Sequence, residues 1–320
     1  MVSILAYPKP LVKDDSSIVL TFVVPTSVGC GLNCRHCFID QRKELENNTK
    51  KLTAEQYVDF IYGIREQNHI SCISIQGKEP FAEDSVPYTL KILKAAQGLN
   101  IPSAIVTNGL YLSKHIKDLS NFDLKEIFVS LDSPRSRFHD QVRGKTGAFQ
   151  NTMQGLQLAL ASPRLSKIVS IASLYLPNKI DFLIDFPRFL HELGISRWFV
   201  TPALTLRSDT DIGRPMHKPQ SLVNDLLTLN EISNEFDIDM VIEDEYYALR
   251  EIRNMYESFN NLKFRILTRP GGIMRLLPSG HCDIGLNLIK IHSKTAPRWD
   301  PQKEHPAIFY NRIVTHYDEI

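Results

Sequence analysis

This sequence of 320 residues has few cysteines, almost no excess of charge and no long apolar run. Its formal net charge is +1, so it offers no broad electrostatic attraction to nucleic acid or to an anionic membrane. No stretch approaches the roughly 18 apolar residues of a membrane span. The first ten residues contain two prolines and no apolar core, which does not fit a secretory signal. We therefore expect a cytoplasmic protein that binds neither nucleic acid nor membrane.

The five cysteines are unevenly placed. Cys30, Cys34 and Cys37 fall within eight residues with a C-x3-C-x2-C spacing, whereas Cys72 and Cys282 are isolated. A disulfide framework does not suit this set, because a chain of this length can build a core without covalent staples, and the unpaired thiols favour a reducing compartment. Iron–sulfur clusters usually take four cysteines. Three thiolates can hold three irons of a [4Fe–4S] cluster and leave the fourth iron for another ligand.

A zinc site is the alternative interpretation of the same three cysteines. Structural zinc takes four ligands in a tetrahedron. Either His36, inside the cysteine run, or a distant residue such as Cys282 would have to supply the fourth ligand. The motifs downstream of the cysteines favour the cluster.

Apolar, β-branched segments alternate with helical segments along the first two thirds of the chain. The expected strands cover residues 17–24, 70–76, 104–107, 124–131, 168–176 and 196–201. One helix is expected directly after the N-cap Thr53. Further helices are expected at residues 85–99, 147–161 and 180–193. This alternation predicts a parallel sheet with right-handed crossovers. Six units close only part of a barrel, so we expect an α/β fold of the partial (β/α)6 TIM-barrel type.

Three regions follow from this pattern. Residues 1–16 form an N-terminal extension, residues 17–202 the partial barrel, and residues 203–320 a small C-terminal α+β extension covering the barrel mouth. In the last region we expect a polar loop at 204–219, a helix at 220–236, a strand at 238–242 and a helix at 245–259. Reactive groups in such barrels collect at the carboxyl ends of the strands.

Short polar motifs follow three of the expected strands. They are Gln76-Gly77-Lys78-Glu79-Pro80, Thr107-Asn108-Gly109 and Ser130-Leu131-Asp132. His139-Asp140, Arg143-Gly144 and Gly147-Ala148-Phe149 come next along the chain. Each also has a plain structural explanation, such as a turn with positive φ at Asn108 or Gly109, a helix cap at Asp132 or a surface ion pair at Arg143.

Together with the cysteine spacing, these motifs resemble the radical S-adenosylmethionine (SAM) superfamily. Residues 76–80 resemble its Gly-Gly-Glu-Pro motif, with Lys78 in place of the second glycine. The later motifs are similar to the subgroup of molybdopterin-precursor synthases and SPASM or twitch enzymes. Residues 273–282 are similar to the start of the auxiliary-cluster domain of SPASM and twitch enzymes, but the further cysteines of that domain are missing. We therefore expect a single cluster.

The resemblance implies which residues bind the cluster and part of SAM. The cluster ligands are the three clustered cysteines, Cys30, Cys34 and Cys37. Gly77 and Glu79 would hold the amino group of SAM, because Gly77 permits close backbone approach and Glu79 supplies an anion. Phe38 would lie against the adenine.

The remaining SAM contacts are expected at the ends of the next strands. Ser130 and Arg143 would bind the SAM carboxylate, since a guanidinium matches a carboxylate bidentately. Asp132 would lie near the ribose or the substrate. Asn108 and Asn178 would lie near the ribose.

The resemblance also implies an activity. Bound SAM would be cleaved reductively to methionine and a 5′-deoxyadenosyl radical, which would take a hydrogen atom from a substrate at the barrel mouth. The electron would come from a flavodoxin or ferredoxin type protein, for which Arg35, Arg42 and Lys43 would offer a mildly basic face.

The substrate is left open by the sequence. It is a small polar molecule, such as a sugar or nucleoside, or a ribosomally made peptide. Residues 1–16 are too short for the usual peptide-binding domain, which favours the small molecule. A third possibility, a non-catalytic zinc or iron–sulfur structural protein, would need neither Glu79 nor Arg143.

Overall fold

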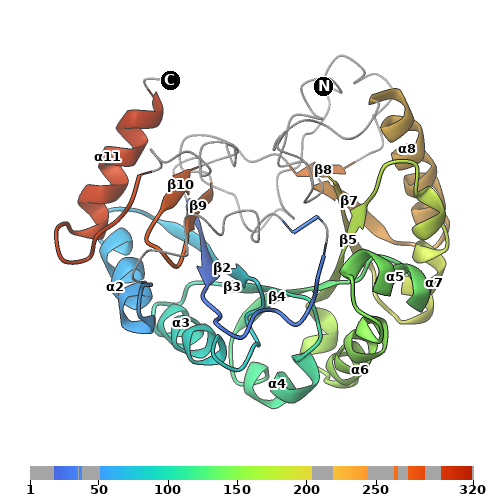
Figure 1. The fold of residues 1–320 in the computed structure, drawn as a ribbon, viewed down its shortest axis with the longest axis horizontal. Coiled ribbons are helices and arrows are strands. Elements are labelled where there is room, and N and C mark those ends of the chain that lie inside the picture. Colours follow the sequence, from blue (N-terminus) through green and yellow to red (C-terminus); the bar gives the residue numbers. More distant parts are fainter. Residues whose placement is uncertain are drawn as a thin grey trace.

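The described part of the chain folds around one sheet of ten strands (Figure 1). The computed structural model describes residues 18–34, 36–37, 51–203, 219–243, 263–265, 273–284 and 297–318. The expectations for residues 1–16, for Arg35, Phe38, Arg42 and Lys43, for the polar loop up to residue 218 and for a helix at 245–259 fall outside these ranges. The predicted α/β class and the partial barrel are confirmed.

The six predicted strands are all present and lie side by side in the order of the sequence. They are β1 (Ile18–Val24), β2 (Ile70–Gly77), β3 (Ser103–Thr107), β4 (Leu124–Ser130), β5 (Val169–Tyr175) and β6 (Arg197–Pro202). Each pairs in parallel with the next. Their carboxyl ends therefore meet at one edge of the sheet, where the motifs follow.

The C-terminal region adds strands to both edges of this sheet. β7 (Asp239–Glu243) and β8 (Lys263–Arg265) continue it in parallel beyond β6. β9 (Ile273–Leu276) pairs in parallel with β1, and β10 (Cys282–Ile284) pairs antiparallel with β9. Residues 273–284 thus extend the barrel sheet instead of forming a separate unit. Coverage of the barrel mouth by residues 203–320 stays a prediction.

Helices lie in an arc on the outside of the sheet (Figure 1). They are α2 (Ala54–Arg65), α3 (Val86–Gly98), α4 (Leu112–Leu119), α5 (Ser136–Arg143), α6 (Ala148–Ala161), α7 (Phe186–Glu192), α8 (Pro219–Glu235) and α11 (Pro306–Asp318). As predicted, α2 begins at a capping box in which Thr53 and Gln56 satisfy each other's backbone N–H groups. The helix expected at 180–193 is divided into a 3-10 turn, η3 (Ile180–Phe182), and α7. No helix in the described ranges is long and apolar enough to cross a membrane.

The two faces of the sheet differ in what they bury. The outer face packs against the helices in one large apolar core. The inner face carries a smaller apolar cluster made of strand residues alone: Val19, Cys72, Ala104, Phe128, Phe199 and Val241. Because side chains alternate along a strand, Thr21 and its β2 partner Ser74 lie on this inner face, one level nearer the carboxyl ends. The barrel interior therefore changes from apolar to polar toward the motif edge.

Helix α11 closes the β1 side of the molecule by packing against α2. Gly63 lies at this contact, where a Cβ atom would be 2.7 Å from Pro306 Cγ. The two helices approach each other so closely that only glycine fits at position 63.

Replacing Gly63 by alanine tests this contact. The intrinsic helix preference of alanine gains up to about 1 kcal/mol, but overpacking typically costs about 1–3 kcal/mol. We expect a net loss of stability, measured as a lower midpoint of thermal unfolding. Gly98→Ala at the end of α3 is the control, since a Cβ there meets nothing within 4 Å. Equal stability of the two variants would refute the close packing of α11 on α2.

Candidate functional site

The predicted site residues gather at the carboxyl ends of β1 to β5. The loop that follows β1, residues 25–37, carries the three cysteines and is called the cysteine loop below. Gly77 and Ser130 end β2 and β4, and Asn108 and Asn178 follow β3 and β5. Phe38 lies outside the described residues.

Two neighbouring segments anchor the cysteine loop through its backbone. On the β3 side, the Asn108 amide Nδ2 donates to the Cys30 carbonyl oxygen at 3.1 Å. On the α5 side, the Asn33 N–H donates to the Arg143 carbonyl oxygen at 3.0 Å. The Cys34 thiol donates to the same carbonyl oxygen, with Sγ 3.7 Å away. Both anchors come from motifs that the sequence analysis selected.

Gly144 explains why glycine follows Arg143. It ends α5 in the left-handed conformation, with φ 63°, which favours glycine. A Cβ atom at this position would lie 2.3 Å from the Asn33 carbonyl oxygen. The Arg-Gly motif therefore lets the end of α5 touch the cysteine loop backbone to backbone.

The three cysteines provide a donor set for an iron–sulfur cluster. Cys34 is buried, and Cys30 and Cys37 are half-buried in the same loop. In the described part of the chain, no three His, Cys, Asp or Glu side chains converge on one ion, so the zinc alternative finds no preformed ligand set there. A cluster takes one thiolate per iron, so its ligands need not meet at a point. The residues therefore fit the cluster.

Burial raises the pKa of the Cys34 thiol to about 11, and the nearby Arg143 charge opposes this effect only in part. Without metal, Cys34 is therefore a neutral thiol at pH 7. Metal ligands must be deprotonated, so binding of a cluster would release the Cys34 proton.

Glu79 is fully buried beneath the loops that follow β2 and β3. One carboxylate oxygen accepts hydrogen bonds from the Phe81 N–H at 3.0 Å and the Thr107 hydroxyl at 2.6 Å. The other accepts from the Asn108 N–H at 2.7 Å. Burial raises the pKa of Glu79 to about 7, and these three donors limit the rise. The carboxylate thus positions Asn108, which in turn holds Cys30.

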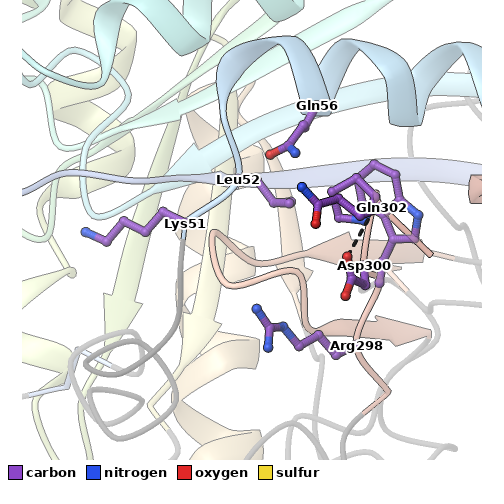
Figure 2. Close-up of a pocket in the computed structure, with 8 residues that line it drawn as sticks. Lys51, Leu52, Gln56, Arg298, Asp300 and Gln302 are labelled. Atoms are coloured by element: carbon purple, nitrogen blue, oxygen red, sulfur yellow. Dashed lines mark hydrogen bonds between the residues drawn. The ribbon is translucent and has the colours of Figure 1, made fainter. Parts of the chain in front are cut away.

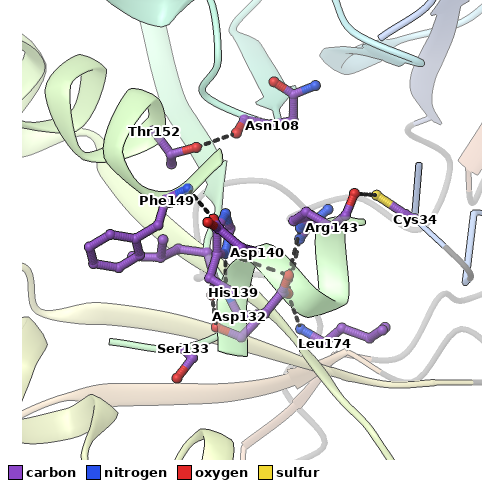
Figure 3. A network of polar contacts seen from close by, with 12 residues as sticks. Cys34, Asn108, Asp132, Ser133, His139, Asp140, Arg143, Phe149, Thr152 and Leu174 are labelled. Atoms are coloured by element: carbon purple, nitrogen blue, oxygen red, sulfur yellow. Dashed lines mark hydrogen bonds and ion pairs between the residues drawn. The ribbon is translucent and has the colours of Figure 1, made fainter. Parts of the chain in front are cut away.

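Asp132 joins β4, β5 and α5 (Figure 3). Its oxygens accept from Arg143 Nε at 2.5 Å, from Arg143 Nη2 at 2.9 Å and from the Leu174 N–H at 2.9 Å. The Asp132 side chain is 0% exposed and that of Arg143 is 11% exposed. Burial by itself would raise the pKa of Asp132, but the Arg143 charge outweighs it and holds the pKa below its ordinary value.

His139 and Asp140 stabilise the backbone around this ion pair. His139 Nδ1 accepts a hydrogen bond from the Asp132 N–H at 3.1 Å. Burial lowers the pKa of His139 to about 4, so the ring is neutral and its proton lies on Nε2. The Asp140 carboxylate accepts from the Gly147 and Phe149 N–H groups at 2.7 and 2.8 Å, which fixes the start of α6.

These contacts add structural partners to two residues that the sequence analysis expects near SAM. Asp132 was expected beside the ribose or the substrate, but its oxygens are engaged inside the protein. Glu79 was expected to hold the SAM amino group, but its carboxylate binds three donors of its own chain. The roles expected for both residues toward SAM stay predictions. Both side chains are fully buried, and each is hydrogen-bonded to the segments around it.

The other expected contacts are placed at the edge of the sheet. Gly77 lies so close to β1 that a Cβ would be 2.8 Å from the Val24 carbonyl oxygen. The Ser130 side chain is half-buried, and no described residue hydrogen-bonds its hydroxyl. Asn178 is exposed, with φ 55°.

The sequence analysis missed residues that support the cysteine loop. Asp84 accepts hydrogen bonds from the Thr26 hydroxyl at 2.6 Å and from Ser27. Although burial acts to raise its pKa, these bonds lower the pKa of Asp84 to about 2. The Thr152 hydroxyl donates to the Asn108 carbonyl oxygen at 2.9 Å. Nothing in the local sequence marks either residue, because their partners are 44 to 58 residues away.

A separate pocket of about 160 Å³ lies beside the start of α2 (Figure 2). It is lined by Lys51, Leu52, Gln56, Arg298, Trp299, Asp300, Pro301 and Gln302. None of the predicted site residues lines it, so we assign the chemistry to the motif edge.

The matches to known proteins include the residues that carry these motifs. The sequence model of the radical SAM superfamily matches residues 24–179. A GTP 3',8-cyclase of Alkaliphilus metalliredigens is 30% identical over 132 residues, which are 41% of this chain and 40% of that protein. A GTP 3',8-cyclase of Listeria welshimeri is 27% identical over 277 residues, which are 85% of this chain and 77% of the relative.

A solved structure has the same fold over most of the chain. SuiB of Streptococcus suis, bound to its precursor peptide SuiA, matches with a TM-score of 0.69 at 15% identity. The match covers 92% of this chain and 65% of that chain. At this identity the likeness shows the fold alone. The chain spans about half the length of the first curated relatives that it matches.

The Asp132–Arg143 pair gives a prediction about stability. Asp132→Asn leaves the buried Arg143 guanidinium without its carboxylate, a change that typically costs about 3–5 kcal/mol. We expect a large fall in the free energy of unfolding, measured with denaturant on the metal-free protein. Asp123→Asn is the control, because Asp123 pairs with Arg164 at the surface and is 88% exposed, where such pairs contribute about 1 kcal/mol at most. Similar losses in both variants would contradict the buried pair.

Proposed function

Because this chain is a member of the radical SAM superfamily, we propose that it is an enzyme that binds one [4Fe–4S] cluster through Cys30, Cys34 and Cys37 and cleaves SAM reductively. The observation that carries the proposal is the construction of the cysteine loop. Its backbone is held from two sides by Asn108 and Arg143. Each of these is held by a buried carboxylate. A loop fixed in this way presents three thiols in a defined arrangement.

When bound, the cluster would supply one electron to SAM, yielding methionine and a 5′-deoxyadenosyl radical that takes a hydrogen atom from the substrate. The protein's own residues bind and orient. Cys34 would give up its proton on cluster binding, and Gly77 lets the end of β2 lie close against the Val24 backbone at the start of the cysteine loop. Ser130, whose hydroxyl no described residue engages, offers a donor to the SAM carboxylate.

Arg143 would act on SAM mainly through its charge. Its Nε and Nη2 donate to Asp132, so it cannot offer the whole guanidinium fork to a second carboxylate. Among the charges that act on the Cys34 thiol, that of Arg143 is the positive one and lowers the pKa of the thiol. Asn178 at the end of β5 is proposed as the ribose contact and Phe38 as the adenine contact.

We propose a small polar molecule as the substrate. The inner face of the barrel carries the hydroxyl groups of Thr21 and Ser74 below Gln76. In the described part of the chain, the buried Nε2 of Gln76 has no hydrogen-bond partner, so it is available to a substrate acceptor. Arg275, the β9 partner of Thr21, is buried at the same level and adds a positive charge. These groups suit a substrate rich in hydrogen-bond acceptors, such as a sugar or nucleoside derivative.

A ribosomally made peptide is the alternative substrate. The relative SuiB was solved with its precursor peptide, and the fold is shared. The polar interior beside β1 and β2 favours the small molecule, because a peptide would not need buried donors at that depth. A flavodoxin or ferredoxin type protein is proposed as the electron donor.

Loss of one thiol tests the cluster assignment. Cys34→Ala should abolish the visible charge-transfer absorbance after anaerobic reconstitution, and also the formation of 5′-deoxyadenosine from SAM, because two thiolates do not hold a stable cubane. Cys72→Ala is the matched control, since Cys72 is buried in the inner face of β2. If Cys34→Ala still cleaves SAM reductively, the ligand assignment is wrong.

Removal of one hydroxyl tests the SAM site. Ser130→Ala should keep the cluster absorbance and weaken SAM binding by about 1.5–3 kcal/mol, the range for a hydrogen bond to a charged group. Equilibrium binding to the reconstituted protein measures this change. Ser71→Ala is the control, because the Ser71 hydroxyl donates to the Ile18 carbonyl oxygen at the opposite end of β2. Unchanged SAM affinity in Ser130→Ala would exclude Ser130 from the site.

A further inference from the structure

The cysteine loop turns one side of its backbone to solvent. Val28 is 63% exposed, an unusual degree for a large apolar side chain. Gly31 and Asn33 are also exposed, while the neighbouring Cys34 is buried against α5. The protein thus holds the buried thiol on one side of the loop and leaves the other side open to a partner.

Two lysines flank this open side. A Cβ atom on Gly31 would lie 2.8 Å from the Tyr111 hydroxyl and 3.6 Å from Lys145 Nζ. Lys114 Nζ lies 5.9 Å from the centroid of the Tyr111 ring. Both lysines are exposed, and neither forms an ion pair within the described ranges. Gly31, Tyr111, Lys114 and Lys145 are called the lysine face below.

The acidic groups around the loop do not cancel these charges directly. Asp84, under the start of the loop, is engaged by Thr26 and Ser27. Asp140 is engaged by the first N–H groups of α6. The lysine face therefore combines two cations with the exposed backbone of Gly31, which is next to Cys30 in the cysteine loop.

We propose that the lysine face is the docking surface for an acidic one-electron carrier protein, an inference that rests on the proposed function. One electron leaves the reduced carrier, which is oxidised, and enters the cluster, which is reduced; no bond is made or broken. Electron transfer requires close approach to the cysteine loop, and the lysine face is where the loop is open. Opposite charges steer such partners together, and redox encounters of this kind use small contact areas. Val28, which is exposed in the same loop as Gly31, offers an apolar side chain to the partner.

Charge reversal of both lysines tests the proposal. The variant Lys114→Glu/Lys145→Glu is compared with Lys94→Glu/Lys167→Glu, in which two other exposed lysines are reversed. Lys94 is in the second half of α3, and Lys167 precedes the amino end of β5. The probe is a purified bacterial flavodoxin of acidic surface, and its dissociation constant is measured at several salt concentrations.

We expect the Lys114/Lys145 reversal to weaken flavodoxin binding at least tenfold and to remove most of its salt dependence, while the control reversal changes binding less than threefold. With dithionite as reductant, 5′-deoxyadenosine formation should match the wild type, because the chemical reductant needs no docking surface. Equal flavodoxin affinity in both reversals would overturn the docking site. Failure of the wild type to cleave SAM with dithionite would instead overturn the proposed function, and the affinity comparison would still decide the docking surface.

Discussion

The ion pair between Asp132 and Arg143 is the interaction on which the site depends. Its two charges are buried, where an uncompensated charge would be strongly unfavourable. The two charged side chains therefore fix each other's positions. In doing so they also fix the end of β4 and the end of α5. The Arg143 carbonyl oxygen accepts hydrogen bonds from both the Asn33 N–H and the Cys34 thiol. The position of α5 therefore determines the position of the cysteine loop.

Glu79 performs the equivalent task on the other side of the loop. It collects donors from the segments after β2 and β3, and through Asn108 it reaches the Cys30 carbonyl oxygen. Two buried carboxylates, each in the segment that follows a different strand, thus fix the loop from two sides. Such an arrangement fixes the backbone of the cysteine loop, which suits a site where bound groups carry the chemistry and the protein supplies geometry.

Much of the fold could be predicted because each strand is a short, nearly continuous apolar run, the pattern of a strand covered on both faces. The capping box of Thr53 could also be predicted, because it depends on residues three positions apart. Helices α4 and α5 were missed because they are short and mostly polar, with few apolar residues to reveal a period. The pairing of β9 with β1 was not predicted, because a four-residue strand carries no local signal for a partner strand about 250 positions earlier in the chain.

The sequence by itself determined the cysteine spacing, the order of the strands and the motif residues at their ends, because these depend on neighbours in the chain. Only the tertiary structure decided which motif residues are enclosed by other segments and which remain exposed. Asp132 and Glu79 look like ligand-binding carboxylates in the sequence, and only contacts with residues up to 42 positions away show that they are enclosed. The contact of Gly144 with Asn33 was decided in the same way, since burial is a property of the assembled chain and not of any segment.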